Sequence, residues 1–240
     1  MDLLLSFMGT SILVTSERVI TSKRLHTMKK ISGGFFVCVE GIDGSGKSVF
    51  SHDLAHTLTE RGYSVVLTRE PGGTPLGERI RDLLFDKKTP PCAKSEFLLF
   101  AASRAQHCQD LIQPALTQGS VVISDRMADS SLVYQGYVRG LSLELIRSVN
   151  AWAMGTVTPR ILFYLKVDAA TAFARVTSRK IAPSDFETSI VPLQKAIDGF
   201  NAVFAGNPHV ITLDATQKQE QVLQQGVAAI DALFASSRDL

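Results

Sequence analysis

From about residue 35 onward, short apolar runs alternate with longer segments in which apolar side chains return every three or four residues. The apolar runs are residues 35–39, 64–68, 120–124, 161–165 and 209–213. Runs of this length, rich in Val, Ile and Phe, are typical of strands that are buried on both faces of a sheet. Strands that alternate with helices predict an α/β fold, with a parallel sheet of about five strands, right-handed crossovers and helices on both faces.

The segments between these runs carry the helical period. Phe50, Leu54 and Leu58 form one apolar stripe, and a second stripe contains Leu145 and Trp152. We therefore expect Trp152, the single tryptophan, to lie in the core. The expected helices cover residues 49–61, 77–85, 94–118, 142–155, 169–179, 186–204 and 216–234.

Residues 1–30 do not follow this alternation. Their apolar run from Leu3 to Val14 is too short to cross a bilayer as a helix, and it follows Asp2 instead of a basic region. Two interpretations stay open, a signal peptide or an extension that precedes a natural start at Met28. We favour the second, so residues 1–30 are expected to be a disordered or non-native extension. Residues 31–240 are expected to form a single domain.

Composition narrows the class of protein. The chain has 240 residues, of which 45% are hydrophobic and 20% charged, which is enough for one sizeable core. A net charge of +2, without a dense basic block, argues against nucleic acid or a membrane surface as partner. Three cysteines without C-x-x-C spacing argue against a disulfide framework or a zinc site, and favour a reducing, cytoplasmic setting.

A complete G-x-x-x-x-G-K-[ST] motif follows the first apolar run directly. Its residues are Gly41, Ile42, Asp43, Gly44, Ser45, Gly46, Lys47 and Ser48. In such a phosphate-binding loop, or P-loop, the backbone N–H groups cradle the phosphates of ATP, Lys47 reaches the β and γ oxygens, and Ser48 binds Mg²⁺. The alternative is a chance match in a glycine-rich turn, which the flanking strand and helix disfavour. The loop alone fits an ATPase, a GTPase or a small-molecule kinase, although a guanine-reading N-K-x-D segment is missing.

Charged residues follow two further strands, at the edge where open parallel sheets place their sites. Arg69 follows residues 64–68, and its guanidinium suits a monophosphate, with a plain surface charge as the alternative. Asp125 ends another apolar run as a Mg²⁺-binding acid does. Arg126 beside it would offset the charge that builds up as two phosphates meet. The alternative for this last pair is a structural salt bridge.

Three longer segments narrow the choice. They are residues 68–74 (TREPGGT), 98–104 (LLFAASR) and 125–136 (DRMADSSLVYQG). Together they closely resemble thymidylate kinases of the nucleoside-monophosphate kinase group, especially the bacterial type, from about Phe35 to the end of the chain. The resemblance implies a P-loop NTPase-type sheet with a mobile lid, a homodimer, and transfer of the γ-phosphoryl group of ATP to dTMP in the presence of Mg²⁺.

The resemblance also assigns roles to the acceptor side. Phe100 would stack on the pyrimidine, and Arg104, four residues later on the same helical face, would donate to a base carbonyl. Tyr134 would lie against the sugar and disfavour a 2′-hydroxyl. Asp43 matches the acid near the 3′-hydroxyl and the metal. Hydrogen bonds around the base and phosphate would come from Ser130, Ser131 and Gln135.

Gly44 stands where some relatives carry an arginine that acts on the transferring phosphoryl group, so a cation must come from elsewhere. The expected source is a lid around residues 178–188. Arg175 and Arg179 match arginines on the lid side of the bacterial type. We assign Arg175 to ATP and Arg179 to catalysis. The stretch 182–187 departs from the family, because it lacks the further basic residue usual there.

Two rivals to a dTMP kinase remain. One is a kinase for another nucleoside monophosphate or for a deoxynucleoside, because Arg69 indicates a phosphate on the acceptor without naming its base. The other is a non-catalytic P-loop protein that has lost turnover through the altered lid. Within the kinase interpretation no general base is required, since the acceptor is already a phosphate anion.

Overall fold

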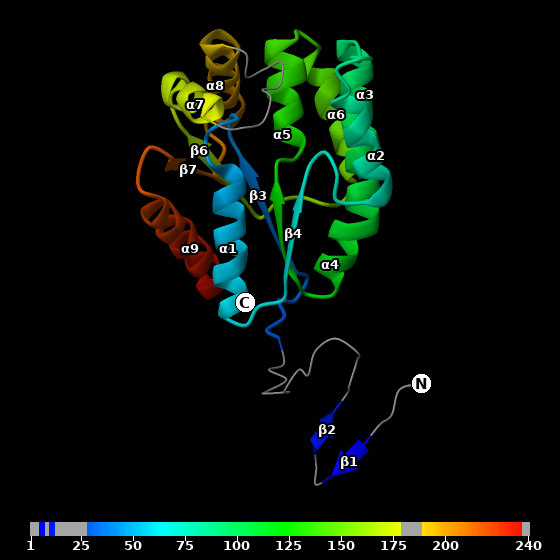
Figure 1. Ribbon diagram of the computed structural model, residues 1–240, viewed down its shortest axis with the longest axis vertical. Coiled ribbons are helices and arrows are strands. Elements are labelled where there is room, and N and C mark those ends of the chain that lie inside the picture. Colours follow the sequence, from blue (N-terminus) through cyan, green and yellow to red (C-terminus); the bar gives the residue numbers. More distant parts are fainter. Residues whose placement is uncertain (1–4, 8–9, 13–27, 179–188, 237–240) are drawn as a thin grey trace.

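The computed structural model describes residues 5–7, 10–12, 28–178 and 189–236 (Figure 1). The five predicted strands are all present, and each begins or ends within a residue or so of its apolar run. They are β3 (Phe35–Glu40), β4 (Val65–Arg69), β5 (Val121–Asp125), β6 (Ile161–Lys166) and β7 (Val210–Asp214). Two short strands, β1 (Leu5–Phe7) and β2 (Thr10–Ile12), form an antiparallel pair of their own.

The five strands form one sheet in the order β4-β5-β3-β6-β7, and every neighbouring pair is parallel. This confirms the predicted fold class. Register places Asp125 opposite both Val39 of the central strand and Arg69 of β4. The carboxyl ends of β3, β4 and β5 therefore bring the P-loop, the Arg69 turn and the Asp125–Arg126 pair to one edge of the sheet.

Helices connect the strands and cover both faces. They are α1 (Lys47–Glu60), α2 (Pro75–Leu84), α3 (Ala93–His107), α4 (Gln113–Thr117), α5 (Ala128–Ser131), α6 (Leu143–Met154), α7 (Ala169–Thr177), α8 (Ile190–Phe204) and α9 (Gln219–Ser236). The predicted helix 94–118 is interrupted by a π-helical stretch, Cys108–Ile112, that joins α3 to α4. A second π-helical stretch, Leu132–Val138, continues α5 and was not predicted.

Two layers of helices enclose the sheet. α1 packs against α9 on one face, and the helices between β4 and β7 cover the other, as right-handed crossovers require (Figure 1). The core between them contains fully buried Phe36, Leu54 and Phe163. Tyr164 and Phe200 stack with ring centroids 5.4 Å apart, which fixes α8 against β6. Within the ranges given above, no helix is long and apolar enough to cross a membrane.

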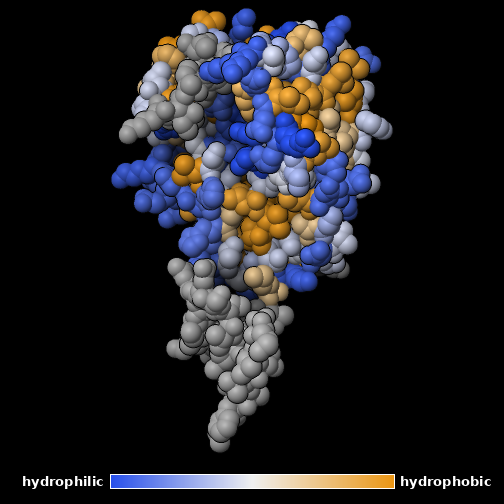
Figure 2. Space-filling view, turned by 45° about the vertical axis from the view of Figure 1, so that its right-hand side comes forward, coloured by the Kyte–Doolittle hydropathy of each residue, from blue (hydrophilic) through white to orange (hydrophobic). Residues whose placement is uncertain are grey.

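The predicted burial of Trp152 is wrong, since 83% of its surface is exposed. The buried face of α6 is offset by one residue and carries Ile146, Asn150 and Ala153. Asn150 is polar but buried because it binds Arg104 of α3, and apolar periodicity cannot reveal such a partner. Trp152 and Leu145 are instead exposed to solvent. Figure 2 shows that hydrophobic side chains gather at several places on the molecular surface.

Candidate active site

The P-loop joins β3 to α1 and holds its lysine in the interior. Lys47 is only 6% exposed, and its ammonium group donates to the Ile42 carbonyl at 2.9 Å and to Asp43 at 3.4 Å. Burial lowers the pKa of Lys47, and the nearby charge of Arg126 acts in the same direction. The loop therefore presents a desolvated cation beside its own backbone, as a phosphate site requires.

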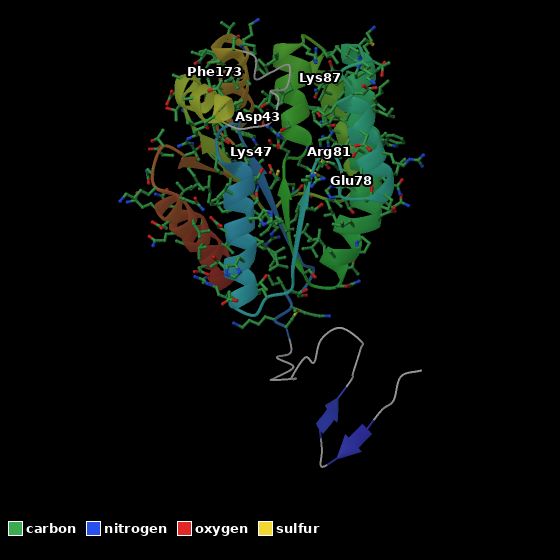
Figure 3. All side chains as sticks on the ribbon, viewed as in Figure 1. Asp43, Lys47, Glu78, Arg81, Lys87 and Phe173 are labelled. Carbon is green, nitrogen blue, oxygen red and sulfur yellow. The ribbon has the colours of Figure 1, made fainter. Side chains whose placement is uncertain are left out.

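Asp43 lies between two cationic side chains, Lys47 and Arg126. Figure 3 shows Asp43 and Lys47 near the carboxyl end of β3. Asp43 accepts from Arg126 Nη2 at 2.5 Å and from Lys47. Burial opposes ionisation of this carboxyl, but the charges of Arg126 and Lys47 hold the pKa of Asp43 well below its usual range. Asp43 is therefore an anion at neutral pH, and a hydrogen-bond acceptor only.

Ser48 and Asp125 meet at the start of α1. The Ser48 hydroxyl donates to Asp125 Oδ2 at 2.5 Å, while Asp125 Oδ1 is buried and has no hydrogen-bond partner among the residues described. Such an unpartnered carboxylate oxygen beside a hydroxyl fits a hard divalent cation. Among all the residues that the structure describes, no group of three or more His, Cys, Asp or Glu side chains is placed to hold a metal ion by itself. Phosphate oxygens and water would have to complete the coordination shell.

Arg126 crosses from the end of β5 to the P-loop. Its Nη1 atom donates to the Gly41 carbonyl and to Ser130 Oγ, both at 3.0 Å. The guanidinium also lies over the Tyr134 ring, 5.2 Å from the centroid. Its closest ion pair is with Asp43 and not with Asp125, so the structural salt bridge considered for the Asp125–Arg126 pair does not form. Arg126 thus points toward the donor loop.

The predicted acceptor side lies at the turn after β4 and at α2. Arg69 is half-exposed and donates to Glu78 Oε2 at 2.8 Å, while Glu78 Oε1 accepts from the Gly73 N–H at 2.9 Å. Arg81, one helical turn after Glu78, donates to the Pro71 carbonyl at 2.9 Å. Figure 3 shows Glu78 and Arg81 on α2, across the sheet edge from Asp43 and Lys47. Sequence reasoning missed both, although an acid and a base three residues apart just after an arginine turn was a usable signal.

Arg104 of α3 lies in the interior of the protein, and its side chain is only 1% exposed. It donates to Glu70 at 2.9 Å, to Asn150 at 2.6 Å and to Ser131 Oγ at 3.3 Å. Phe100, one turn earlier on α3, is only partly buried. A contact between Arg104 and a base carbonyl stays a prediction, and in the structure this arginine joins α3, α5 and α6.

Two further sets of buried polar contacts lie near the predicted acceptor residues. His107 is fully buried, with Nδ1 3.1 Å from Glu70 and Nε2 2.7 Å from Thr68 Oγ1. Gln135 is also buried and donates to Glu96 at 2.6 Å. Glu70, Glu96 and His107 had no predicted role, because their partners come from distant parts of the chain.

On the lid side, Arg175 of α7 joins two loops. Its guanidinium donates to the Gly44 carbonyl at 3.3 Å and to the Ala215 carbonyl, after β7, at 3.0 Å. Gly44 has a φ of 84°, and a Cβ there would overlap the Ala172 carbonyl oxygen. The loop therefore has no room for a side chain at this position. Arg179 and the expected lid beyond Ser178 lie outside the described residues.

A cavity of about 930 Å³ lies at the other edge of the sheet, bordered among others by Lys30, Tyr63 and Arg160. It contains no P-loop residue, and the carboxyl ends of α4 and α6 lead toward it. The chemistry therefore belongs to the carboxyl edge of the strands.

The Ser48 hydroxyl of the P-loop bonds to the Asp125 carboxylate, and Arg69 and Arg81 lie across the sheet edge from this loop. This arrangement defines a P-loop kinase of the class that phosphorylates nucleoside monophosphates. Residues 39–225 match the family described as thymidylate kinase. The chain belongs to the thymidylate kinase family.

Individual relatives agree with this assignment over most of their length. A thymidylate kinase of Halothermothrix orenii is 40% identical over 193 residues, which cover 79% of this chain and 92% of that protein. One of Chlorobaculum tepidum is 38% identical over 207 residues, or 82% and 97% of the two chains. A crystal structure of thymidylate kinase from Ehrlichia chaffeensis superposes with a TM-score of 0.65 at 35% identity, covering 82% of this chain and 99% of that one.

Proposed function

We propose that this chain transfers the γ-phosphoryl group of ATP to dTMP, giving dTDP and ADP. The observation that carries the proposal is the position of Arg126, which starts from the strand beside the acceptor turn and bonds to Gly41 and Asp43 of the donor loop. A guanidinium that spans the two sides offsets the charge of two anions brought together. Membership of the thymidylate kinase family supports dTMP as the acceptor.

On the donor side, the N–H groups of the P-loop, Lys47 and Arg175 would hold ATP. Ser48 and Asp125 would bind Mg²⁺, supported by the unpartnered Asp125 oxygen. When bound, this ion would neutralise phosphate charge and orient the β and γ oxygens. Asp43, which also belongs to this loop, would accept from the sugar 3′-hydroxyl of the acceptor dTMP.

On the acceptor side, Arg69 would exchange its contact with Glu78 for the monophosphate. Phe100 would stack on the base, with polar contacts from Arg104 and Gln135. Tyr134 would exclude a 2′-hydroxyl. Ser130 and Ser131 would complete the hydrogen bonds around base and phosphate.

A coupled assay of ADP release over a panel of nucleoside monophosphates and deoxynucleosides tests the function. We expect turnover with dTMP at a kcat/KM well above that for dUMP, dCMP, AMP and thymidine. Preference for a different acceptor would favour the rival kinase. Binding of ATP without turnover on any acceptor would favour a non-catalytic P-loop protein.

We further propose that the chain forms a homodimer through the exposed apolar side chains of α2, α3 and α6. Leu83 of α2, Leu98 of α3 and Trp152 of α6 are each more than half exposed. Exposed apolar surface of this kind marks interfaces. Figure 2, in which the right-hand side of Figure 1 is turned forward, shows hydrophobic side chains gathered on the surface. Light scattering should give twice the chain mass for wild type and a monomer for Trp152→Glu. Val191→Glu, on the exposed face of α8, is the control and should stay dimeric.

The remaining assignments concern the cellular compartment and the N-terminal boundary of the domain. All three cysteines are unpaired, which suits a reducing cytoplasm. We propose that residues 31–240 form the catalytic domain and that residues 1–30 are an extension. A chain that starts at Met28 should keep the wild-type kcat, and loss of folding would contradict this boundary.

A further inference from the structure

Glu40 is the last residue of β3, directly before the P-loop, and its side chain is fully buried. A carboxylate in such a place is strongly unfavourable unless it is hydrogen-bonded. Glu40 Oε1 accepts from the Met127 N–H at 2.9 Å and the Ser130 N–H at 3.2 Å, and Oε2 accepts from the Ser130 hydroxyl at 2.6 Å. A side chain of the donor strand therefore holds the first turn of α5.

The segment held in this way carries Arg126 in a disfavoured backbone conformation. Its φ is 75°, and it is the only non-glycine residue with positive φ in the described part of the chain. Such a conformation persists where the neighbouring backbone is fixed on both sides. The Arg126 N–H donates to the Val39 carbonyl at 2.9 Å, and the next N–H, of Met127, donates to Glu40.

The same carboxylate directs the arginine head group. Ser130 Oγ accepts from Arg126 Nη1 at 3.0 Å and donates to Glu40, so one hydroxyl joins the two charged side chains. The direct distance between Arg126 Nη1 and Glu40 Oε2 is 4.0 Å. Glu40 thus contacts the Arg126 segment through both backbone and side chain, although it lies too deep to touch a substrate.

We propose that Glu40 is a positioning residue for phosphoryl transfer, whose buried carboxylate fixes the Arg126 guanidinium between the donor and acceptor phosphates. The proposal rests on the proposed kinase function and adds a group that acts only through another. A charged group displaced by about 1 Å loses on the order of 100-fold in rate, so a positioning residue can be as important as a contacting one.

The test is a double-mutant cycle on the full chain, with Glu40→Gln, Arg126→Ala and the double variant measured for kcat and for KM with dTMP and ATP. Glutamine keeps the shape of glutamate without its charge. It should fold, because its side-chain oxygen can still accept from the Met127 and Ser130 N–H groups. We expect Glu40→Gln to lower kcat on the order of 100-fold, with a much smaller change in KM.

The decisive result is the effect of Glu40→Gln when Arg126 is already alanine. If Glu40 acts through Arg126, this second change leaves kcat unaltered, whereas multiplied losses would overturn the proposal. Should Glu40→Gln fail to fold, Glu40→Asp replaces it in the same cycle, because its shorter side chain keeps the charge but loses reach toward Met127 and Ser130, and multiplied losses there would overturn the proposal equally. A wild-type chain without dTMP-dependent ADP release would instead contradict the kinase function. Asp231→Asn, on the outer face of α9, controls for loss of a carboxylate.

Discussion

The Ser48 hydroxyl donates to the Asp125 carboxylate at 2.5 Å across 77 residues of sequence, and the second oxygen of that carboxylate is buried without a partner among the described residues. If this pair binds Mg²⁺, Asp125→Asn should lower kcat on the order of 100-fold, or about 2.7 kcal/mol in activation free energy. It should also raise the Mg²⁺ concentration needed for half-maximal rate, measured by titration after chelation. Asp231→Asn is the matched control, and an unchanged Mg²⁺ requirement in Asp125→Asn would contradict the assignment.

Gly44→Ala should destabilise the fold, because a Cβ would meet the Ala172 carbonyl in addition to adopting a φ of 84°. We expect a loss of about 1–3 kcal/mol in the free energy of unfolding, beyond that of the control, by urea denaturation. Gly33→Ala is that control, because its φ is 73° and a Cβ there would meet nothing within 4 Å. Equal losses in the two variants would show that contact with α7 is not tight.

The Glu40 carboxyl should make stability depend on pH. Burial raises its pKa from 4.5 to about 7, with Asp129 acting in the same direction and Arg126 and Ser130 opposing it. The native state therefore retains a proton that the unfolded state releases, so stability from this group is complete below pH 4.5 and is lost as pH rises to 7. The whole loss is about 3 kcal/mol. The free energy of unfolding, measured by denaturation at several pH values, should fall between pH 4.5 and 7 in wild type and fall less steeply in Glu40→Gln. Parallel pH dependences in the two proteins would contradict this prediction.

Arg179→Ala should lower kcat far more than it weakens dTMP binding, if this arginine acts only in the closed, reacting complex. Arg175→Ala should mainly raise KM for ATP, because Arg175 contacts the P-loop through the Gly44 carbonyl. Steady-state kinetics on both variants separates the two roles. A near-normal kcat in Arg179→Ala would remove that arginine from the mechanism.

Tyr134→Ala should relax discrimination against ribonucleotides, because it removes the ring proposed to lie against the sugar. The measurement is the ratio of kcat/KM for dTMP to that for its ribose analogue. Tyr137→Ala, in the same π-helical stretch but on the exposed side, is the control. An unchanged ratio in Tyr134→Ala would show that the sugar is recognised elsewhere.

The strands, the P-loop and the strand-end residues could be predicted because each depends on local pattern. A buried strand is a short apolar run, and a parallel sheet brings strand ends together wherever they stand in the sequence. The side that α6 buries could not be predicted, because it includes Asn150, a polar residue whose buried partner is Arg104. The apolar stripe that contains Leu145 and Trp152 is shifted by one residue from the buried face, and both side chains are exposed.

The supporting carboxylates were missed for a related reason. Glu40 and Glu70 are next to predicted site residues, but sequence does not reveal that an acid is buried or which distant donors satisfy it. Glu70 pairs with Arg104 and His107 on α3, and Glu40 with residues that follow β5. A family resemblance can therefore propose the direct contacts of a site, whereas the side chains that hold those residues had to be found in three dimensions.

Arg175 bonds to Gly44 in the P-loop and to Ala215 after β7, and α7 that carries it ends at Thr177, just before the proposed lid. A nucleotide that fixes the two loops would also fix the start of the lid. If lid closure raises the affinity for ATP by some factor, bound ATP must raise the equilibrium constant for lid closure by the same factor. ATP should therefore slow amide hydrogen exchange in α7 before any dTMP is bound, and Arg175→Ala should abolish that protection.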